Sequence, residues 1–420
     1  MRLIACPSAE FDRLALASRL PVPEVSRVVA RILADVRRRG DRALVDLTSR
    51  LDGVRLAPHS LRVSERELRV ARVDADLDRA ARRTLRSVTA FARASMPRDG
   101  RIRNRHGAVV GEKFDPLERV GVYIPGGQVP LVSTVFMTAA IARAAGVAEI
   151  VACTPPPVSP EILWALNLCG VREVFRVGGA QAIAAMAFGT RAIRPVDKIF
   201  GPGNAYVTEA KRQVFGIVGV DLLAGPSELM VLADATANSA WAAADLLAQA
   251  EHGTGRERVF CVGSSVAVLR AIHGAVEKGA RAWPANRGLR SVLARNTSWI
   301  LARTPSAMAL AANRIAPEHL QVMTRGAETL LRRIRTAGGA FLGNWTPTVL
   351  GDFVAGPSHT LPTGGAGRSF SGLRTSDFMR RTSVVRYDRR GVALAAADVR
   401  AFARAERLPA HGASLELRLR

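Results

Sequence analysis

The chain is 420 residues long and carries a formal net charge of +24, from 60 Lys and Arg against 36 Asp and Glu. Its length exceeds what one hydrophobic core usually serves, so two or more domains are expected. Hydrophobic residues make up 48% of the chain, which excludes a disordered protein, while the charge makes nucleic acid the first partner to consider.

Helical patterns dominate the first 100 residues. Apolar residues recur at helical spacing, and capping signals such as Gly40 and the Ser64–Glu67 capping box separate successive helices. Four helices are expected, at about 25–39, 41–51, from 65 onward and 77–91.

From about residue 118, short apolar segments alternate with helical ones. This alternation predicts parallel strands covered by helices on both faces. A break near residues 224–227 divides the pattern into two α/β units. The expected strands are 119–124, 149–154, 173–177 and 197–200 in the first unit, and 229–233, 258–262, 299–302, 320–323 and 340–342 in the second.

The last 60 or so residues leave this alternation. We expect a glycine-rich loop at 364–367, a short strand at 383–387 and a helix from about 395 to 407.

The basic residues are almost all arginines and are dispersed along the chain. There is no basic tail, no ribonucleoprotein-type aromatic stretch and no zinc-knuckle spacing, and aromatic residues make up only 5% of the chain. We therefore expect an arginine-rich surface rather than nucleic-acid binding.

The four cysteines are far apart and form no CxxC pair, which predicts reduced thiols and a cytoplasmic protein. No apolar run reaches about 18 residues and the first residues lack the apolar core of a signal peptide, so no membrane association is expected.

Four glycine-rich segments follow expected strands, where α/β proteins bind their ligands. Glycine there lets backbone N–H groups approach a phosphate or ribose. Neither GxGxxG nor a Walker motif occurs, and each segment alone could be an ordinary turn. Together they indicate a nucleotide site, and they lie at 125–127, 178–181, 201–204 and 225–228.

A second group of polar residues has metal-binding or acid–base capability. Gln249 and His252 are three residues apart on one helix face, and Glu318 and His319 lie in a loop that enters a strand. Asp352 is expected in a loop before Gly356, and His411 follows a helix that carries Glu406. Two histidines, a carboxylate and a carboxamide could bind zinc. Because these residues are widely separated, spacing alone favours ordinary structural histidines over a zinc site.

The ordered set of motifs resembles the histidinol dehydrogenase family from about residue 22 to residue 415. Single blocks are weak, but their order is specific. They lie at 120–127, 178–185, 201–204, 209–212, 224–228, 245–252, 316–320, 342–347, 351–352, 361–363 and 405–411.

The resemblance and the α/β pattern imply two Rossmann-like parallel-sheet domains around one cleft. A helical N-terminal section, 1–117, is expected to pack on the first α/β domain, 118–228, which holds NAD. The second α/β domain, 229–372, is expected to carry zinc and catalysis, and residues 373–420 a dimerisation arm.

The resemblance also implies the activity: oxidation of L-histidinol to L-histidine through L-histidinaldehyde, with two NAD⁺ and one zinc per subunit, as the last step of histidine biosynthesis. The family is homodimeric, and the arm completes the partner's site. The implied residues are Glu318 and His319 for acid–base catalysis; Gln249, His252, Asp352 and His411 for zinc; Ser227, Gln249, His252, His319, Asp352, Glu406 and His411 for substrate; and Tyr123, Gln181 and Asn204 for NAD.

Three features depart from the family pattern: Ser358, where asparagine is expected, Gln128, and the glycine-rich loop 364–368. Three alternatives remain. The chain could be a relative that oxidises another polar alcohol, such as a sulfonated diol. It could instead be a nucleic-acid-binding protein, as its positive charge suggests, or a zinc hydrolase that acts without NAD.

Overall fold

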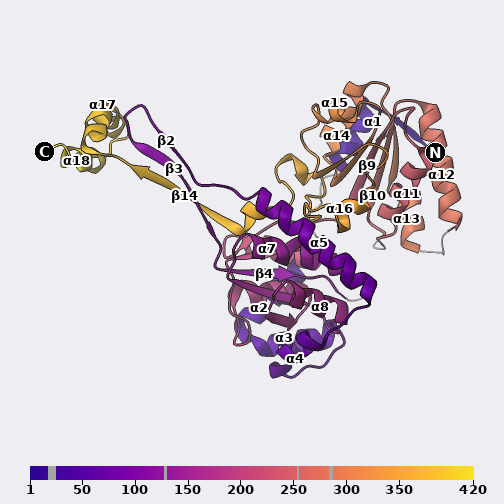
Figure 1. Ribbon diagram of the computed structural model, residues 1–420, viewed down its shortest axis with the longest axis horizontal. Helices are drawn as coiled ribbons and strands as arrows, with labels where there is room; N and C mark the ends of the chain where they lie inside the picture. The colour runs from indigo at the N-terminus through magenta and orange to yellow at the C-terminus, as the bar shows by residue number, and fades with distance from the viewer. Residues whose placement is uncertain (18–24, 127–129, 253–254, 283–286) are drawn as a thin grey trace.

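The computed structural model describes residues 1–17, 25–126, 130–252, 255–282 and 287–420. It contains two parallel sheets flanked by helices and a three-stranded antiparallel sheet that projects away from them (Figure 1). The expected α/β class is therefore confirmed. Gly127 and Gln128 lie outside the described residues.

The first sheet has five parallel strands in the order β6-β5-β4-β7-β8. The order runs in opposite directions on either side of the β4–β7 pair, the place where doubly wound folds bind ligands. The strands are β4 (Arg119–Tyr123), β5 (Glu149–Thr154), β6 (Glu173–Arg176), β7 (Lys198–Phe200) and β8 (Gly219–Val220).

Helices cover both faces of the first sheet because their apolar stripes pack on strand residues that alternate between faces. One face carries α2 (Ser26–Arg39), α3 (Asp41–Leu51), α9 (Gly179–Phe188) and α10 (Ala205–Val214). The other carries α4 (Glu65–Val70), α5 (Ala75–Ala94), α6 (Val132–Val135), the π-helical segment η2 (Phe136–Ala140), α7 (Ile141–Ala144) and α8 (Pro160–Leu168).

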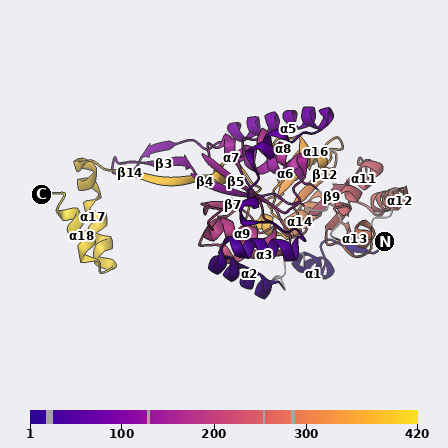
Figure 2. The same cartoon turned by 90° about the horizontal axis from the view of Figure 1, so that it is seen from below.

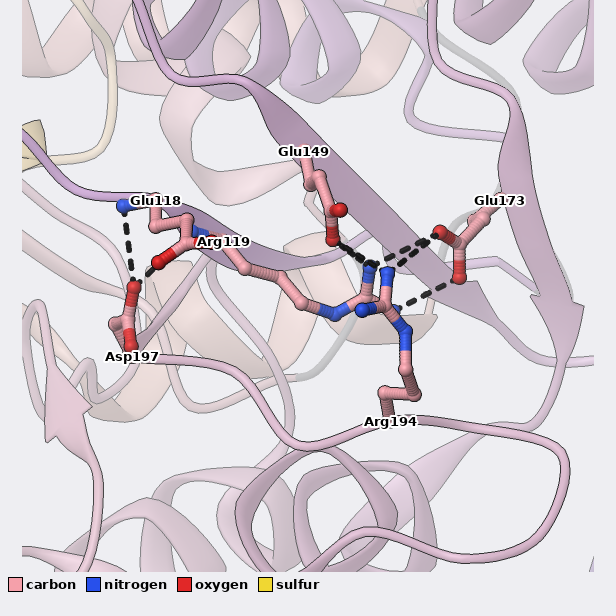
Figure 3. Close-up of polar contacts among 6 residues, drawn as sticks. All are labelled: Glu118, Arg119, Glu149, Glu173, Arg194 and Asp197. Carbon is pink, nitrogen blue, oxygen red and sulfur yellow. Dashed lines mark hydrogen bonds and ion pairs between the residues drawn. The ribbon is translucent and has the colours of Figure 1, made fainter.

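Charged side chains cross-link the amino ends of the first sheet (Figure 3). The buried guanidinium of Arg119 donates to Glu149 Oε2 over 2.5 Å and to both carboxylate oxygens of Glu173 over 2.9 and 2.8 Å. Arg194 adds a 2.6 Å bond to Glu149, and the Asp197 carboxylate accepts from the Arg119 backbone N–H. This end of the sheet is thus closed by ion pairs, whereas its carboxyl end is rich in glycine.

The second sheet has six parallel strands in the order β1-β11-β10-β9-β12-β13. They are β1 (Leu3–Ala5), β11 (Thr297–Leu301), β10 (Arg258–Gly263), β9 (Glu228–Ala233), β12 (His319–Met323) and β13 (Gly339–Leu342). One face packs on α11 (Ser239–Ala250), α12 (Val266–Ala282) and α13 (Arg287–Arg295), the other on α1 (Ala9–Ala17), α14 (Pro305–Ile315) and α15 (Ala327–Leu331).

The first 17 residues differ from the sequence expectation. Instead of packing on the first α/β unit with the rest of section 1–117, β1 pairs in parallel with β11, Leu3 opposite Trp299, and α1 packs on α14. A three-residue strand shows no periodicity of its own and is defined by a partner almost 300 residues away, so the sequence pattern could not reveal it.

The remaining elements build a projecting structure, here called the arm (Figures 1 and 2). Its stalk is the antiparallel sheet. The sequence did not predict strands β2 and β3, because residues 100–117 carry only weak periodicity and follow a section that reads as helical. The arm consists of β2 (Gly100–Arg103), β3 (Val109–Pro116), β14 (Met379–Arg386), α17 (Arg389–Ala405) and α18 (Pro409–Glu416).

Short helical turns connect these parts: η1 (Pro58–Ser60), α16 (Val349–Phe353), η3 (Ala366–Arg368) and η4 (Thr375–Phe378). Among the described residues, no helix has the length and apolar character needed to cross a membrane.

Candidate active site

Glu318 and His319 lie where α14 leads into β12, and both side chains are buried. The neighbouring strand β9 holds them through the backbone of its first residue, Glu228. The Glu228 N–H donates to Glu318 Oε2 over 2.9 Å, and the Glu228 carbonyl lies 3.1 Å from His319 Nδ1. The parallel pairing of β9 with β12 therefore fixes the orientation of both candidate catalytic groups.

Burial changes the acid–base properties of this pair. It raises the pKa of Glu318 well above the usual value, and the nearby Glu228 and Asp352 carboxylates add to the increase. It lowers the pKa of His319 to about 4, so the imidazole is neutral at pH 7. Burial also raises the pKa of Glu228 to about 7, against the opposing charge of Arg258. A neutral imidazole beside a carboxyl group of raised pKa can exchange protons with a substrate.

The expected zinc ligands Gln249, His252 and Asp352 come from two helices beside this pair. Gln249 is buried near the end of α11, and its Nε2 lies 3.3 Å from Nδ1 of His252, just beyond that helix. Asp352 belongs to α16 and not to a loop as the sequence suggested; its Oδ1 lies 3.7 Å from His319 Nε2. Burial raises the pKa of Asp352, while charges on His359 and His252 oppose the rise, which places these groups near one another.

His359 joins this cluster although sequence reasoning gave it no role. Its Nδ1 lies 3.0 Å from the Asp352 carbonyl oxygen, and burial lowers its pKa. In the sequence, its place near Asp352 could have been inferred from its position seven residues later, in the same Gly-Pro-rich segment. The adjacent Ser358, which replaces the expected asparagine, donates to the Met137 carbonyl over 2.9 Å and ties this segment to the first α/β unit.

Glu228 is the second residue that the sequence reasoning left without a role. Its carboxylate, buried in the second sheet, accepts from the Gly364 N–H over 3.1 Å. The Gly225 N–H, three residues earlier, donates to Thr363 Oγ1. The glycine-rich loop after Thr363 is thus attached to the segment that carries Ser227, whose side chain bonds to Glu318.

The structure does not bring Glu406 and His411 to this cluster within one chain. Glu406 follows the last residue of α17, and His411 lies in α18, at the far end of the arm (Figure 1). Within the described ranges, no three His, Cys, Asp or Glu side chains gather as a metal site would require. Gln249, His252 and Asp352 are chemically suitable zinc donors, but a tetrahedral site needs a fourth ligand from elsewhere.

The three expected NAD residues lie at the carboxyl ends of the first sheet. Tyr123 ends β4, and its hydroxyl accepts from the Gly179 N–H over 3.1 Å. Gln181 lies in the first turn of α9, and Asn204 caps α10 by accepting from two backbone N–H groups. Because Tyr123 ends β4 while Gln181 and Asn204 follow β6 and β7, the three residues line one edge of the first sheet. The glycine-rich segment 225–228, which was expected to follow a strand like the others, instead leads into β9 of the second sheet.

The loop that carries Asn204 is held by a buried ion pair. Lys211 Nζ pairs with the Asp221 carboxylate and donates to the Gly201 carbonyl over 2.8 Å, and the Gly201 N–H donates to Asp221 over 2.7 Å. Gly201 has φ +110°, and a Cβ there would lie 2.2 Å from the Tyr123 carbonyl oxygen. Only glycine therefore fits where this loop passes β4.

Comparisons with known proteins agree with this arrangement. The family model described as histidinol dehydrogenase matches residues 17–419. Histidinol dehydrogenases from Cereibacter sphaeroides and Gluconobacter oxydans are 41% and 43% identical over 98% of this chain, and the matches span 96% and 97% of those proteins.

The folds agree as well. A crystal structure of histidinol dehydrogenase from Elizabethkingia anophelis is 33% identical, covers 100% of this chain and 98% of its own, and superposes with a TM-score of 0.94. An acetylating aldehyde dehydrogenase from Geobacillus thermoglucosidasius shares the fold alone, at 14% identity over 90% of this chain and 94% of its own and a TM-score of 0.51. Family match, sequence identity over nearly the full length and fold all agree, and the chain belongs to the histidinol dehydrogenase family.

Proposed function

We propose that this protein oxidises L-histidinol to L-histidine through L-histidinaldehyde, with two NAD⁺ per turnover, as the last step of histidine biosynthesis in the cytoplasm. The observation that carries the proposal is the buried Glu318–His319 pair beside Gln249, His252 and Asp352 in a chain of this family. The alcohol carbon gives up two hydrides, one to each NAD⁺, and takes its second oxygen from water.

Zinc would be held by Gln249, His252, Asp352 and His411. There it would act as a Lewis acid that anchors the imidazole and amine nitrogens of the substrate, while NAD⁺ bound at Tyr123, Gln181 and Asn204 would accept hydride. Ser227 and Glu406 would complete the polar contacts with the substrate. The donor types support this assignment, since nitrogen and oxygen ligands suit zinc.

His319 would remove the hydroxyl proton in the first oxidation. Its imidazole is neutral, as a base must be, and the Glu228 carbonyl fixes the orientation of Nδ1, which leaves Nε2 toward Asp352 and the proposed substrate. Glu318 would take a proton from the water that attacks the aldehyde. Its raised pKa makes it a stronger base than an ordinary carboxylate.

The arm would deliver Glu406 and His411 to the site of a second subunit. Support comes from its extended shape and from large apolar side chains left exposed on it, such as Phe402 at 68%, Val385 and Leu417. Apolar patches of this kind usually mark a protein interface. We therefore propose a homodimer with one zinc per subunit. Section 118–228 would act as the NAD side and section 229–372 as the zinc side, while section 373–420, together with β2 and β3, would form the dimerisation arm.

The direct test is NADH formation from L-histidinol in zinc-supplemented buffer. Two NADH should form per histidinol consumed, and a strong chelator should abolish the reaction until zinc returns. If histidinol yields no NADH but a member of a diol panel does, the proposed substrate is wrong. Absence of NADH with every alcohol would leave the proposal without support.

A mixing experiment tests the exchange of arms. If each arm completes its partner's site, H411A mixed with H319N should recover part of the activity, because one site of the mixed dimer is intact. E318Q mixed with H319N is the matched control and should recover nothing, since both changes lie in the same part of one chain. Equal results in the two mixtures would contradict arm exchange.

A further inference from the structure

Unpaired buried polar atoms cluster at the carboxyl ends of β5 and β6. Throughout the described residues, Thr154 Oγ1, Gln181 Oε1 and Asp52 Oδ2 are among the few buried side-chain oxygens without a hydrogen-bond partner. Thr154 is 0% and Gln181 1% exposed. A buried oxygen without a partner costs about 1–3 kcal/mol, and a bound water, ion or ligand that supplies the missing hydrogen bond removes this cost.

Glycines bring these three residues around one space. A Cβ added to Gly126 would lie 3.2 Å from Thr154 Oγ1, and one added to Gly179 would lie 2.8 Å from Gln181 Oε1. A Cβ on Gly178 would lie 3.4 Å from Asp52 Oδ1. The three side chains, here called the polar cradle, therefore lie around the backbone of glycines, which carry no side chains of their own.

Asp52 supplies the charge of the polar cradle. It caps the C-terminal end of α3, and its only hydrogen bond in the described structure is through its backbone N–H, to Thr48. Burial raises the pKa of its carboxyl group, and its charge reaches the Tyr123 hydroxyl. A partly buried carboxylate without a cation accepts hydroxyl donors and repels phosphate.

The position of Asp52 decides which part of a dinucleotide it would meet. The helix α3 packs on α2 and α9 of the first unit. Figure 1 shows α3 far from β9, the strand that pairs with β12 and hence lies beside His319. Since the nicotinamide ring must reach the site of hydride transfer near His319, the ribose beside Asp52 is the one at the other end of the cofactor.

We propose that Asp52 and Thr154 bind the adenosine ribose of the cofactor, and that the Asp52 carboxylate selects NAD⁺ against NADP⁺, whose 2′-phosphate it repels. This inference rests on the proposed NAD dependence. In Rossmann sites an acidic residue binds the ribose hydroxyl groups of NAD. Asp52, at the end of α3, would have this role here, although the chain has no GxGxxG segment.

The test is equilibrium binding of NAD⁺ and NADP⁺ by titration calorimetry, with thermal unfolding measured on the same samples. D52N should weaken NAD⁺ binding about 10- to 100-fold, the usual contribution of a charged hydrogen bond. It should also reduce the difference in affinity between NAD⁺ and NADP⁺. T154V should weaken NAD⁺ binding less. Neither variant should unfold at a lower temperature than wild type, because each removes an unpaired buried group.

The control is D46N on the same helix, because Asp46 is exposed and pairs with Arg39. Its affinities should equal those of wild type. If wild type binds NAD⁺ and D52N binds it equally well with the same NADP⁺ discrimination, the inference is wrong and the proposed function stands. If wild type binds no NAD⁺, the proposed function itself is overturned, and this inference with it.

Discussion

Loss of one charge from the buried Lys211–Asp221 pair should strongly destabilise the first α/β unit. The two side chains are 3% and 1% exposed, so neither charge can turn to water when its partner is lost. K211M would leave the Asp221 carboxylate buried without its paired cation, which typically costs about 3–5 kcal/mol. For a domain of this size each kcal/mol lowers the melting temperature by about 2–4 °C, so a decrease of roughly 6–20 °C is expected.

The double variant K211M/D221N separates charge from geometry. It removes both charges, while the amide oxygen at 221 can still accept the bond that the Gly201 N–H donates. Its stability should return to within about 1–2 kcal/mol of wild type, because the remaining loss is the Lys211 bond to the Gly201 carbonyl.

Differential scanning calorimetry at fixed pH and protein concentration measures these changes. The control is R79M, because Arg79 pairs with Asp76 on the exposed side of α5, where an ion pair contributes at most about 1 kcal/mol. The reasoning is refuted if K211M melts within about 2 °C of wild type, or if K211M/D221N is as unstable as K211M.

Three further predictions concern single groups. H319N should lower turnover by roughly 10²- to 10⁴-fold with unchanged zinc content, and unchanged turnover would exclude His319 as the base. Because burial raises the pKa of Glu228 to about 7, its contribution to stability is fully present below the unfolded pKa and decreases as the pH rises through 7. The melting temperature of E228Q relative to wild type should therefore increase from pH 4.5 to pH 8, and a constant difference would contradict the raised pKa. Burial raises the pKa of Cys6 to about 11 and of Cys153 and Cys169 to about 12, so the folded protein should resist a thiol-specific reagent; complete labelling within minutes would disprove their burial.

Local sequence patterns predicted most of the two α/β units. Nine expected strands occur within a few residues of their expected positions, because alternating strands and helices leave a periodic apolar signal. The capping box at Ser64 also occurs as predicted. Helix α16 was read as a loop, since five residues are too few to show a helical period.

The candidate site was predictable where its residues are close in the chain. Glu318 and His319 are neighbours, and Gln249 and His252 share one helix turn. Asp352 and His411 were candidates by residue type, but the family resemblance was needed to assign them as zinc ligands. Neither route indicated Asp52, because an Asp-Gly pair at a helix end is an ordinary turn signal in the sequence.

Sequence alone determined the arginine-rich composition, the α/β alternation and the glycines at the strand ends, because these depend on residue type and local spacing. Tertiary structure decided which strands became neighbours, and hence which groups are buried together. Only the β9–β12 pairing orients Glu318 and His319, and burial is the main cause of their shifted pKa values. Of the arginines behind the charge of +24, Arg258 and Arg368 lower the pKa of Glu228 beside this cluster, whereas the dispersed surface charge is screened by water and salt.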